Sequence, residues 1–303
     1  MQSLDQENNQ NEKKDTNKID SLSEETVISE AIKFHLEGNI SEAIKYYEIS
    51  IKNGFADQNV FSNYGVILQE LGKLDEAELS TREAIKLNPD FANAHSNLGN
   101  ILRDLGDLEG AELHTRRAIK INPNFANAHS NLGNILRDLG DLEGAELHTR
   151  RAIKLNPDFA NAHSHLGIIL RDLLDFSGSQ FHLRKAIKLK PNFANAYYSL
   201  ALVLKDLGQF EDAESNIRKA IEFKSDMKEA YFVLGKLLSY SGRLDDAISN
   251  YKKAFELGIE YDRYISEIGN VNLKKGNYFE GLRNLKAGQG TILFDLKKGF
   301  SIL

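Results

Sequence analysis

The sequence contains no cysteine, which excludes several kinds of site at once. A disulfide framework, a thiolate metal site and a cysteine nucleophile all require that residue. Long apolar runs are missing as well. No stretch approaches the roughly 18 residues that a membrane span needs, and the N-terminus has no positively charged region followed by an apolar core. We therefore expect a cytoplasmic protein without a membrane partner.

Positive charge is scarce relative to negative charge, since the 303 residues carry a formal net charge of -6. Binding to nucleic acid is driven largely by lysine and arginine side chains that release counterions from phosphates, so we expect no nucleic-acid partner. The sequence also has no HExxH motif, no phosphate-binding glycine loop and no Gly-x-Ser-x-Gly motif. No catalytic residue, cofactor or metal site is predicted, and the chain is not expected to be an enzyme.

The first 22 residues are strongly polar. Residues 1–20 include seven asparagines or glutamines and eight charged residues, with almost no large apolar side chain. Such a segment cannot bury enough apolar surface to offset the entropy that it loses on ordering. We expect residues 1–22 to be disordered.

From residue 23 to residue 287 the sequence repeats every 34 residues. The stretch Ala92–Phe125 is copied by residues 126–159 with only two changes, Ile121 to Leu155 and Asn124 to Asp158. A period of this length is typical of a solenoid of stacked repeats. Eight units are predicted, starting near residues 24, 58, 92, 126, 160, 194, 228 and 262. Apart from a break at Leu174, the same step is kept by Pro89, Pro123, Pro157 and Pro191 and by Gly38, Gly72, Gly106, Gly140, Gly208, Gly242 and Gly276.

Each unit is predicted to be a pair of helices. In the third unit, apolar residues recur at helical spacing and without strand alternation, at Ala94, Leu98, Ile101, Leu102 and Leu105. Gly106 can end this helix in the left-handed conformation, and a second helix then carries Leu108, Ala111, Ala118 and Ile119. The residue that opens the second helix is a capping type at Asn39, Asp107, Asp141, Asp175 and Asn277.

The junctions between helices are predicted from small and turn-forming residues. Gly99 and Ala111 allow the two helices of a unit to approach closely, Pro123 ends the second helix, and Asn124 is placed to cap the next one. Unit five departs from the pattern at Leu174 and Ser179, where glycine and alanine are expected. A bulky residue in a left-handed turn is costly, so we expect the turn and the local helix packing to differ there.

These features resemble the tetratricopeptide repeat family. The resemblance rests on the 34-residue period and on Asn97, Leu98, Gly99, Gly106, Ala111, Ala118 and Pro123, while the family's usual aromatic residues are replaced by His95, Leu102 and Thr115. It implies an all-α fold, a right-handed superhelical α-solenoid whose first helices line a concave groove and whose second helices lie outside. It also implies a non-catalytic interaction scaffold for a protein or an extended peptide.

The first helices carry a polar face opposite the apolar one, and most of its residues are asparagines. An amide both donates and accepts hydrogen bonds, so a ladder of amides can pair with the backbone of an extended peptide. Similar asparagine-lined superhelices occur in the repeat arm of O-linked N-acetylglucosamine transferase. The alternative, a polar face that is only hydrated, stays open at this point. The candidate peptide-binding asparagines are Asn59, Asn63, Asn93, Asn97, Asn100, Asn127, Asn131, Asn134, Asn161 and Asn195.

The character of this face changes in the later units. The serine position of the early units becomes Tyr198 and Phe232, and the position of Asn97 becomes His165 in unit five. We predict a second part of the groove in which His165, Tyr198 and Phe232 accept an apolar side chain. Packing of Tyr198 and Phe232 within the repeat junctions is the alternative.

Charged residues and histidines recur with the same period. Arg103 stands next to Asp104, and the equivalent pairs follow in later units, so we expect charge neutralisation within adjacent pairs. The histidines form two rows in which neighbours are 34 residues, or one repeat, apart. One repeat is too far for shared metal coordination at about 2 Å, so we expect these histidines to pack or to lie on the surface. These rows are His95, His129 and His163, then His114, His148 and His182.

Residues 288–303 leave the repeat pattern. Gly288 and Gly290 break the helix, and residues 291–295 and 300–303 flank a turn, which predicts a β-hairpin. The hairpin is expected to cap the last repeat, with two alternatives: pairing in a homodimer, or a remnant of a junction to another domain. For the whole chain, the alternative function is a recognition or targeting subunit of a separately encoded enzyme, such as a glycosyltransferase or an oxygenase.

Overall fold

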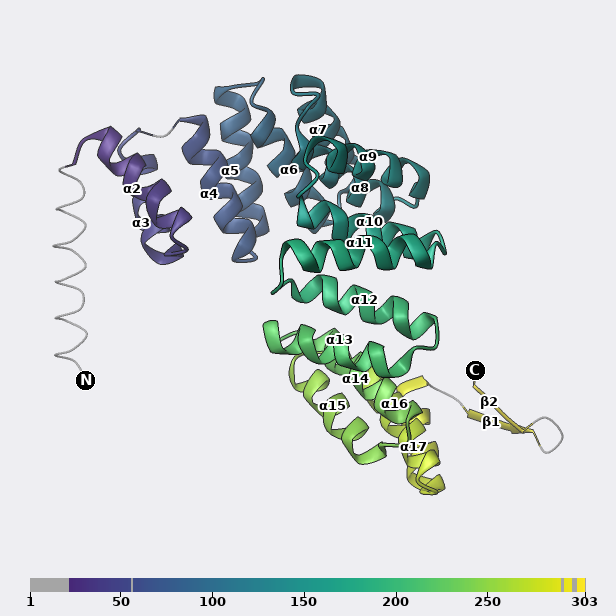
Figure 1. Cartoon of the computed structure of the whole chain (residues 1–303). Helices are drawn as coiled ribbons and strands as arrows, with labels where there is room; N and C mark the ends of the chain where they lie inside the picture. The colour runs from purple at the N-terminus through teal and green to yellow at the C-terminus, as the bar shows by residue number, and fades with distance from the viewer. Residues whose placement is uncertain (1–21, 56, 290–291, 296–298, 303) are drawn as a thin grey trace, which may run out of the picture. The chain divides into compact units, whose positions relative to one another are not determined.

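The computed structural model describes residues 22–55, 57–289, 292–295 and 299–302. The disorder expected for residues 1–22 therefore falls, except for residue 22, outside the described residues. Within the described ranges, sixteen helices are followed by one hairpin of two strands (Figure 1). Contacts divide the chain into two units, here called the N-terminal unit, Met1–Pro157, and the C-terminal unit, Asp158–Leu303. Each unit is described by itself.

The helices form consecutive pairs, and the two helices of a pair pack against each other. We call the first helix of a pair the A helix and the second the B helix. The A helices are α2 (Glu24–Leu36), α4 (Gln58–Glu70), α6 (Ala92–Leu105), α8 (Ala126–Asp138), α10 (Ala160–Asp172), α12 (Ala194–Asp206), α14 (Lys228–Tyr240) and α16 (Tyr261–Lys274). The B helices are α3 (Ile40–Lys52), α5 (Leu74–Leu87), α7 (Leu108–Ile121), α9 (Leu142–Leu155), α11 (Phe176–Leu189), α13 (Phe210–Phe223), α15 (Leu244–Glu256) and α17 (Tyr278–Gln289).

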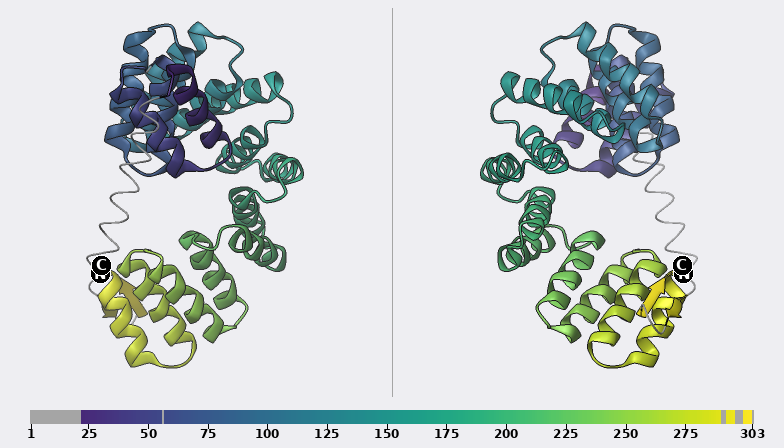
Figure 2. Two further views of the ribbon diagram at one scale, coloured as in Figure 1. Left: turned by 90° about the vertical axis from the view of Figure 1, so that its left-hand side faces the viewer. Right: turned by 90° about the vertical axis from the view of Figure 1, so that its right-hand side faces the viewer.

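Stacking of the pairs brings equivalent positions of neighbouring repeats together. In the N-terminal unit α6 packs against α4 and α8, and in the C-terminal unit α10 packs against α12. Figure 2 shows the helices of each unit lying side by side in this way. A side chain on one A helix therefore lies beside the side chain 34 or 35 residues further along, which is the geometry on which the site depends.

The apolar face of each A helix forms the core of the stack. Ala94, Leu98 and Ile101 are fully buried in α6, and Leu102 is 3 % exposed. Burial of one such leucine contributes about 1.5–3 kcal/mol. Leu105, which the sequence placed in the same apolar stripe, is 37 % exposed, because it lies in the last turn of the helix beside Gly106.

Close approach of the paired helices depends on a glycine in the A helix. A Cβ atom added at Gly99 would lie 3.1 Å from the carbonyl oxygen of Ala111 and would overlap the hydroxyl of Thr115. The expectation that Gly99 and Ala111 permit this approach is confirmed. Ala111 and Ala118 are both fully buried on the facing B helix.

The turns between paired helices use the expected chemistry. Asp107 accepts a hydrogen bond from the backbone N–H of Gly110 at 2.9 Å, and Asp141 and Asp175 cap their helices in the same way. The prediction that Asn124 caps the next helix is wrong. The residue before α8 is Phe125, whose side chain makes no capping hydrogen bond, and the amide oxygen of Asn124 instead accepts from Arg151 on α9.

The altered turn expected at Leu174 is also wrong. Leu174 adopts φ 64°, in the left-handed region that Gly106 occupies in the third repeat. Its N–H donates to the carbonyl of Arg171 at 2.9 Å, as the N–H of Gly106 donates to Arg103 at 3.0 Å. The side chain is 73 % exposed and meets no obstacle in that conformation. The fold imposes the turn on leucine, at the usual cost of a left-handed residue.

Ser179 is accommodated in the same repeat by a hydrogen bond. It is fully buried, and its hydroxyl donates to the carbonyl oxygen of Gly167 on the paired helix at 2.6 Å. The polar atom that replaces an alanine methyl is therefore satisfied inside the core.

The hairpin expected at the C-terminus is present. Strands β1 (Ile292–Asp295) and β2 (Gly299–Ile302) pair antiparallel, with Ile292 opposite Ile302 and Asp295 opposite Gly299.

Candidate functional site

The surface of interest is the polar side of the A helices, here called the A-helix face. In the N-terminal unit its centre is a ladder of asparagine and serine side chains. The amide nitrogen of Asn97 donates to the hydroxyl of Ser62 at 3.0 Å, and Asn131 donates to Ser96 at 3.1 Å. Each hydrogen bond joins one A helix to the next, so the ladder holds neighbouring repeats in register.

The ladder leaves hydrogen-bonding capacity at the surface. Ser62 and Ser96 are almost completely buried, while Asn97 and Asn131 are half-buried above them. Within the described residues, the amide oxygens of Asn97 and Asn131 accept no hydrogen bond. Because each oxygen has two lone pairs, both asparagines can accept from the backbone N–H groups of a bound chain.

The other asparagines of this unit differ in exposure. Asn93 and Asn127 are exposed, and Asn100 and Asn134 are half-buried. Two of the predicted asparagines are already engaged: Asn59 donates to Asp57 at 2.9 Å, and Asn63 is hydrogen-bonded to the hydroxyl of Tyr47, whose pKa is raised by burial.

Charged side chains form a second ladder at the edge of this face. The sequence predicted that each basic residue pairs with the acid next to it. The shortest ion pairs instead join consecutive repeats, so this prediction is wrong for them. Arg103 binds Asp138 at 2.5 Å in the N-terminal unit, and Arg171 binds Asp206 at 2.6 Å in the C-terminal unit. Adjacent pairs persist at longer distances, as between Lys205 and Asp206 at 3.3 Å. Stacking decides the pairing because the next repeat presents its carboxylate closer than the neighbouring residue does.

In the C-terminal unit the A-helix face contains pockets. Asn195 and Tyr198 line one of about 540 Å³, together with Ile168, Met227 and Leu257. Tyr198 is half-buried, and burial raises the pKa of its hydroxyl. The structure thus brings these two predicted residues together. Asn161 is exposed and His165 half-buried on α10.

Phe232 is less accessible than its predicted role requires. It is 5 % exposed, and its ring centroid lies 5.5 Å from that of Tyr251 on the paired helix. Two cations also cover the ring, Arg263 at 4.6 Å and Lys236 at 5.1 Å. Phe232 lines a pocket of about 310 Å³, but its ring is covered by Tyr251 of the same repeat and by Arg263 of repeat eight.

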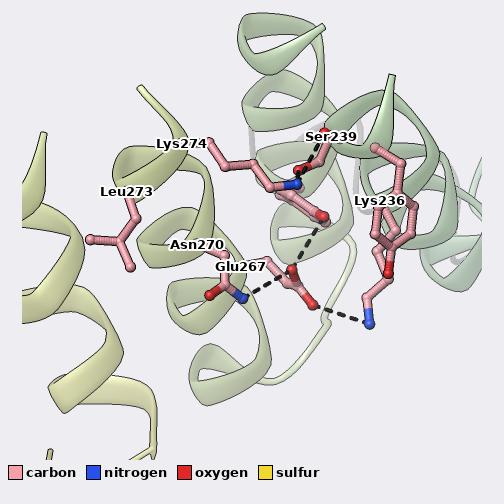
Figure 3. Close-up of a pocket in the computed structure, with 8 residues that line it drawn as sticks. Lys236, Ser239, Glu267, Asn270, Leu273 and Lys274 are labelled. Atoms are coloured by element: carbon pink, nitrogen blue, oxygen red, sulfur yellow. Dashed lines mark hydrogen bonds and ion pairs between the residues drawn. The ribbon is translucent and has the colours of Figure 1, made fainter. Parts of the chain in front are cut away.

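A polar pocket of about 420 Å³ between α14 and α16 was missed by the sequence reasoning (Figure 3). Glu267 lies at its centre, where it accepts from Lys236 at 3.1 Å and from the Tyr251 hydroxyl at 3.4 Å. Burial and the neighbouring carboxylate raise the pKa of Tyr251, so this hydroxyl stays a donor. At the other end of the pocket the Lys274 ammonium donates to the hydroxyl of Ser239 at 2.9 Å and to its carbonyl oxygen at 3.1 Å.

The repeat period was the signal that could have found this pocket. Lys236 and Asn270 are equivalent to Asn100, while Glu267 and Lys274 are equivalent to Asn97 and Asp104. Counting in steps of 34 residues therefore marks all four as members of the A-helix face.

The histidine rows form contacts that the 34-residue spacing did not predict. His95 on α6 and His114 on α7 lie 3.1 Å apart between their Nδ1 atoms, and His129 and His148 repeat this contact at 3.0 Å. His163 and His182 form a third pair at 2.9 Å. The paired residues are 19 apart in sequence, across the turn of one repeat.

One proton arrangement fits these pairs. The Nε2 atom of His95 lies 3.0 Å from the carbonyl oxygen of Pro89, which can only accept, so Nε2 carries a proton. The Nδ1 atom of neutral His95 then accepts from Nδ1–H of His114. Burial lowers the pKa of both rings, which favours this uncharged state. Among the described residues, no group of three or more histidine or acidic side chains is arranged to hold a metal ion.

The sequence matches profiles of one repeat family. Profiles described as TPR repeat match residues 65–106 and 99–140, and profiles described as tetratricopeptide repeat match residues 126–159, 182–215 and 228–257. The chain belongs to the tetratricopeptide repeat family. Because this family consists of protein-interaction modules, the chain is a protein-interaction scaffold. No curated protein matches the sequence.

Solved structures share the fold at low sequence identity. A tetratricopeptide repeat protein from Parabacteroides merdae is 19 % identical with a TM-score of 0.63, covering 82 % of this chain and 98 % of that one. The APC/C hetero-tetramer Cut9-Hcn1 gives a TM-score of 0.74 at 14 % identity, over 86 % of this chain and 52 % of that chain. Pseudomonas aeruginosa pilF gives 0.58 at 18 % identity, over 65 % and 90 %. These likenesses show the fold alone.

A helix that crosses a bilayer must be both long and apolar. Of the helices in the described ranges, none combines the length and the apolar character that crossing a bilayer needs.

Proposed function

We propose that the chain is a non-catalytic scaffold that binds an extended peptide, or an extended segment of a protein, along its A-helix face. One observation carries the proposal: the asparagines of the ladder each use one amide N–H to join the repeats, and their amide oxygens accept no hydrogen bond from the described residues. Amides at a regular spacing recognise peptide backbone, which every sequence shares. The aromatic and charged side chains of the C-terminal unit would then supply preference for particular residues.

To test this proposal, peptides that bind the full chain are selected from a displayed library of random 12-residue peptides. Their affinities for the wild type and for variants of the full chain are then compared. We expect Asn97→Ala combined with Asn131→Ala to weaken the binding of the selected peptides about 5- to 150-fold, because each of the two lost hydrogen bonds is worth about 0.5–1.5 kcal/mol. Tyr198→Ala, tested separately, should weaken the binding only of peptides that carry an apolar residue.

A matched control removes two amides from B helices. Asn216 and Asn250 are half-buried, and each donates to a carbonyl of its own helix at 2.8 Å. Asn216→Ala combined with Asn250→Ala should leave the affinity unchanged. If neither the double variant on the A helices nor Tyr198→Ala changes binding, the A-helix face is not the peptide site.

The partner itself is to be sought in the native cell, by affinity purification of the tagged chain and mass spectrometry. We expect the purified partners to contain extended segments that bind through the A-helix face. A stable, stoichiometric enzyme partner would instead favour the alternative function, a recognition subunit of that enzyme.

For the C-terminal hairpin we propose a capping role on the last repeat. Deleting residues 289–303 should then lower the stability of α16 and α17 without changing the mass of the protein in solution. A mass that falls by half on deletion would instead assign the hairpin to a homodimer contact.

A further inference from the structure

Three histidine pairs lie between the paired helices of repeats three to five, and each pair brings two ring nitrogens face to face. The Nδ1 atoms are 3.1 Å apart in the first pair, 3.0 Å in the second and 2.9 Å in the third. The two rings of each pair lie within 24° of parallel. Imidazole nitrogens are common metal ligands, so this repeated contact is a candidate metal site. The pairs are His95 with His114, His129 with His148, and His163 with His182.

The A-helix histidine is oriented as a metal ligand is. In the first pair the Nε2–H of His95 donates to the carbonyl oxygen of Pro89 at 3.0 Å, and in the second His129 donates to Pro123 at 3.2 Å. A histidine that binds a metal through one nitrogen almost always donates its other N–H to a carbonyl or a carboxylate, which fixes the tautomer and the ring. The lone pair of Nδ1 is therefore aimed at the partner histidine in both pairs.

The B-helix histidine can give up the shared proton. In the metal-free protein the Nδ1–H of His114 donates to Nδ1 of His95. Within the described residues, the Nε2 atom of His114 has no hydrogen-bond partner, and the ring is half-buried. The proton can therefore move from Nδ1 to Nε2 by exchange with water. Both rings stay neutral, both Nδ1 lone pairs become free for a metal ion, and no net proton is released.

The number of ligands limits which metal can bind. Among the residues that the structure describes, no third histidine or acidic side chain completes a metal site with either of these pairs. Zinc takes four ligands, of which the protein supplies three or more. Copper(I) accepts two nitrogen ligands in line, and imidazole is a suitable ligand for copper. Its single charge also costs less to bury than the charge of a divalent ion.

The pair needs only a small movement to hold such an ion. Two metal–nitrogen bonds of about 2 Å in line place the Nδ1 atoms about 4 Å apart, so the rings have to separate by about 1 Å. His95 is 6 % exposed and held by the carbonyl of Pro89, whereas His114 is half-buried and held only by this contact. The movement therefore falls to His114.

We propose that each histidine pair binds one copper(I) ion between its two Nδ1 atoms. The ion takes the place of the proton that joins the rings in the metal-free protein. The chain then carries up to three copper(I) ions, one in each of repeats three to five.

The first two pairs should differ in affinity because their neighbouring charges differ. Beside the first pair, Arg117 is balanced by Asp90 at 2.7 Å, whereas beside the second, Arg151 meets the neutral amide of Asn124 at 3.3 Å. An unbalanced arginine repels a bound cation. The side chains are exposed, so the first pair should bind copper(I) about two- to fivefold more tightly. On the B-helix side both pairs are alike, since the neighbouring arginine is balanced by a glutamate: Arg82 with Glu78, and Arg116 with Glu112.

The test is a titration of the full chain with copper(I), without oxygen and with excess ascorbate. Native mass spectrometry counts the bound ions, and we expect three. The chain has no cysteine, so no thiolate competes for the ion. X-ray absorption of the loaded protein should show two nitrogen neighbours around each copper.

Glutamine variants link the ions to the pairs. The combination of His114→Gln, His148→Gln and His182→Gln should remove all three ions, while the glutamine amides can still donate to the remaining rings. The control combines His35→Gln with His165→Gln, the two histidines outside the pairs, and should keep three ions. Circular dichroism shows whether each variant has folded. Should the triple variant not fold, His114→Gln alone decides, because it should remove one ion.

The predicted difference between the first two pairs needs chains that keep one pair each. The first pair is isolated by His148→Gln with His182→Gln, and the second by His114→Gln with His182→Gln. Competition with a coloured copper(I) chelator gives the affinity of each. Adding Asp90→Asn to the first chain and Asn124→Asp to the second should reverse their order.

Three results overturn the proposal. The first is a wild-type chain that binds no copper(I). The second is a folded glutamine variant that binds as many ions as the wild type. The third is a control that loses the ions, since the paired histidines are then not the ligands. An unchanged order of affinities after the exchange of Asp90 and Asn124 would overturn only the assigned effect of the neighbouring charges.

Discussion

Repeats three and four differ from repeats seven and eight at the same positions of the same helices. In the first pair, the A-helix face carries uncharged asparagines that hydrogen-bond to buried serines of the preceding repeat. In the second pair, Lys236 and Glu267 stand at asparagine positions and Lys274 stands at the position of Asp104, and all three line a pocket. The backbone geometry is shared, so the repeat decides where a side chain points and its identity decides what the face can bind. An amide ladder can pair with any peptide backbone, whereas an uncompensated charge selects a ligand of the opposite charge.

The cores of the two regions differ as well. The largest change in stability is expected for a substitution that tests this difference. Tyr251 is fully buried, and a Cβ atom added at Gly235 on the paired helix would lie 2.7 Å from its ring. Tyr251→Ala should lower the free energy of unfolding by about 3–5 kcal/mol, because the lost ring leaves a cavity. The equivalent residue of repeat four is the smaller Thr149, whose replacement by alanine should cost about 1 kcal/mol.

Hydrogen exchange is the suitable measurement, since repeat proteins open locally. Protection should fall in α14 to α16 for Tyr251→Ala and in α8 and α9 for Thr149→Ala. Equal losses in the two variants would show that the aromatic residue has no special part in the C-terminal core.

The two regions should also differ in how their stability depends on pH, because the histidine pairs occur only in repeats three to five. Repeat seven has Tyr231 and Asn250 at the equivalent positions. Burial lowers the pKa of both rings in each of the pairs His95 with His114 and His129 with His148. Below the ordinary histidine pKa of about 6.5, the unfolded chain then binds more protons than the folded one. The stabilisation is complete above that pH and is lost as the pH falls towards the lowered values.

The expected result is a melting temperature that falls between about pH 7.5 and pH 5.5, a range in which exposed carboxylates hardly titrate. Replacing His114 and His148 by glutamine, whose amide can still donate, should flatten this dependence. Asn250→Gln is the control, since nothing titrates at that position. An unchanged slope in the histidine variant would mean that other groups cause the pH dependence.

The turn at Leu174 provides a smaller test of how strictly the repeat fixes its backbone. Leu174→Gly should raise the free energy of unfolding by about 1 kcal/mol, because glycine adopts positive φ without the steric cost that leucine bears. Gly208→Leu, at the equivalent turn of repeat six, should lower stability by a similar amount. Chemical unfolding measures both, and opposite signs are required.

The smallest effect is expected for the charged ladder. Arg103 and Asp138 are one-third and one-quarter exposed, so their contact should contribute no more than about 1 kcal/mol. A double-mutant cycle with Arg103→Ala and Asp138→Ala measures it. A coupling of zero would show that the two residues hold no register between repeats, whatever their distance.

Much of the fold could be predicted because the repeat multiplies each local signal. Gly106, Asp107 and Ala111 set a turn, a cap and a close approach through backbone sterics and short-range hydrogen bonds. A prediction was wrong where it was based on the preference of a single residue. Leu174 was expected to alter its turn, yet the flanking helices hold it at φ 64°.

The sequence by itself determined the helical repeat, its period and the rows of residues that share the A-helix face, because these follow from local conformational preferences and from counting. Tertiary structure decided which rows touch. It placed His95 against His114, joined Asn97 to Ser62 and left Lys274 opposite a hydroxyl. Such contacts depend on the distance and angle between stacked helices, which no single stretch of the sequence specifies.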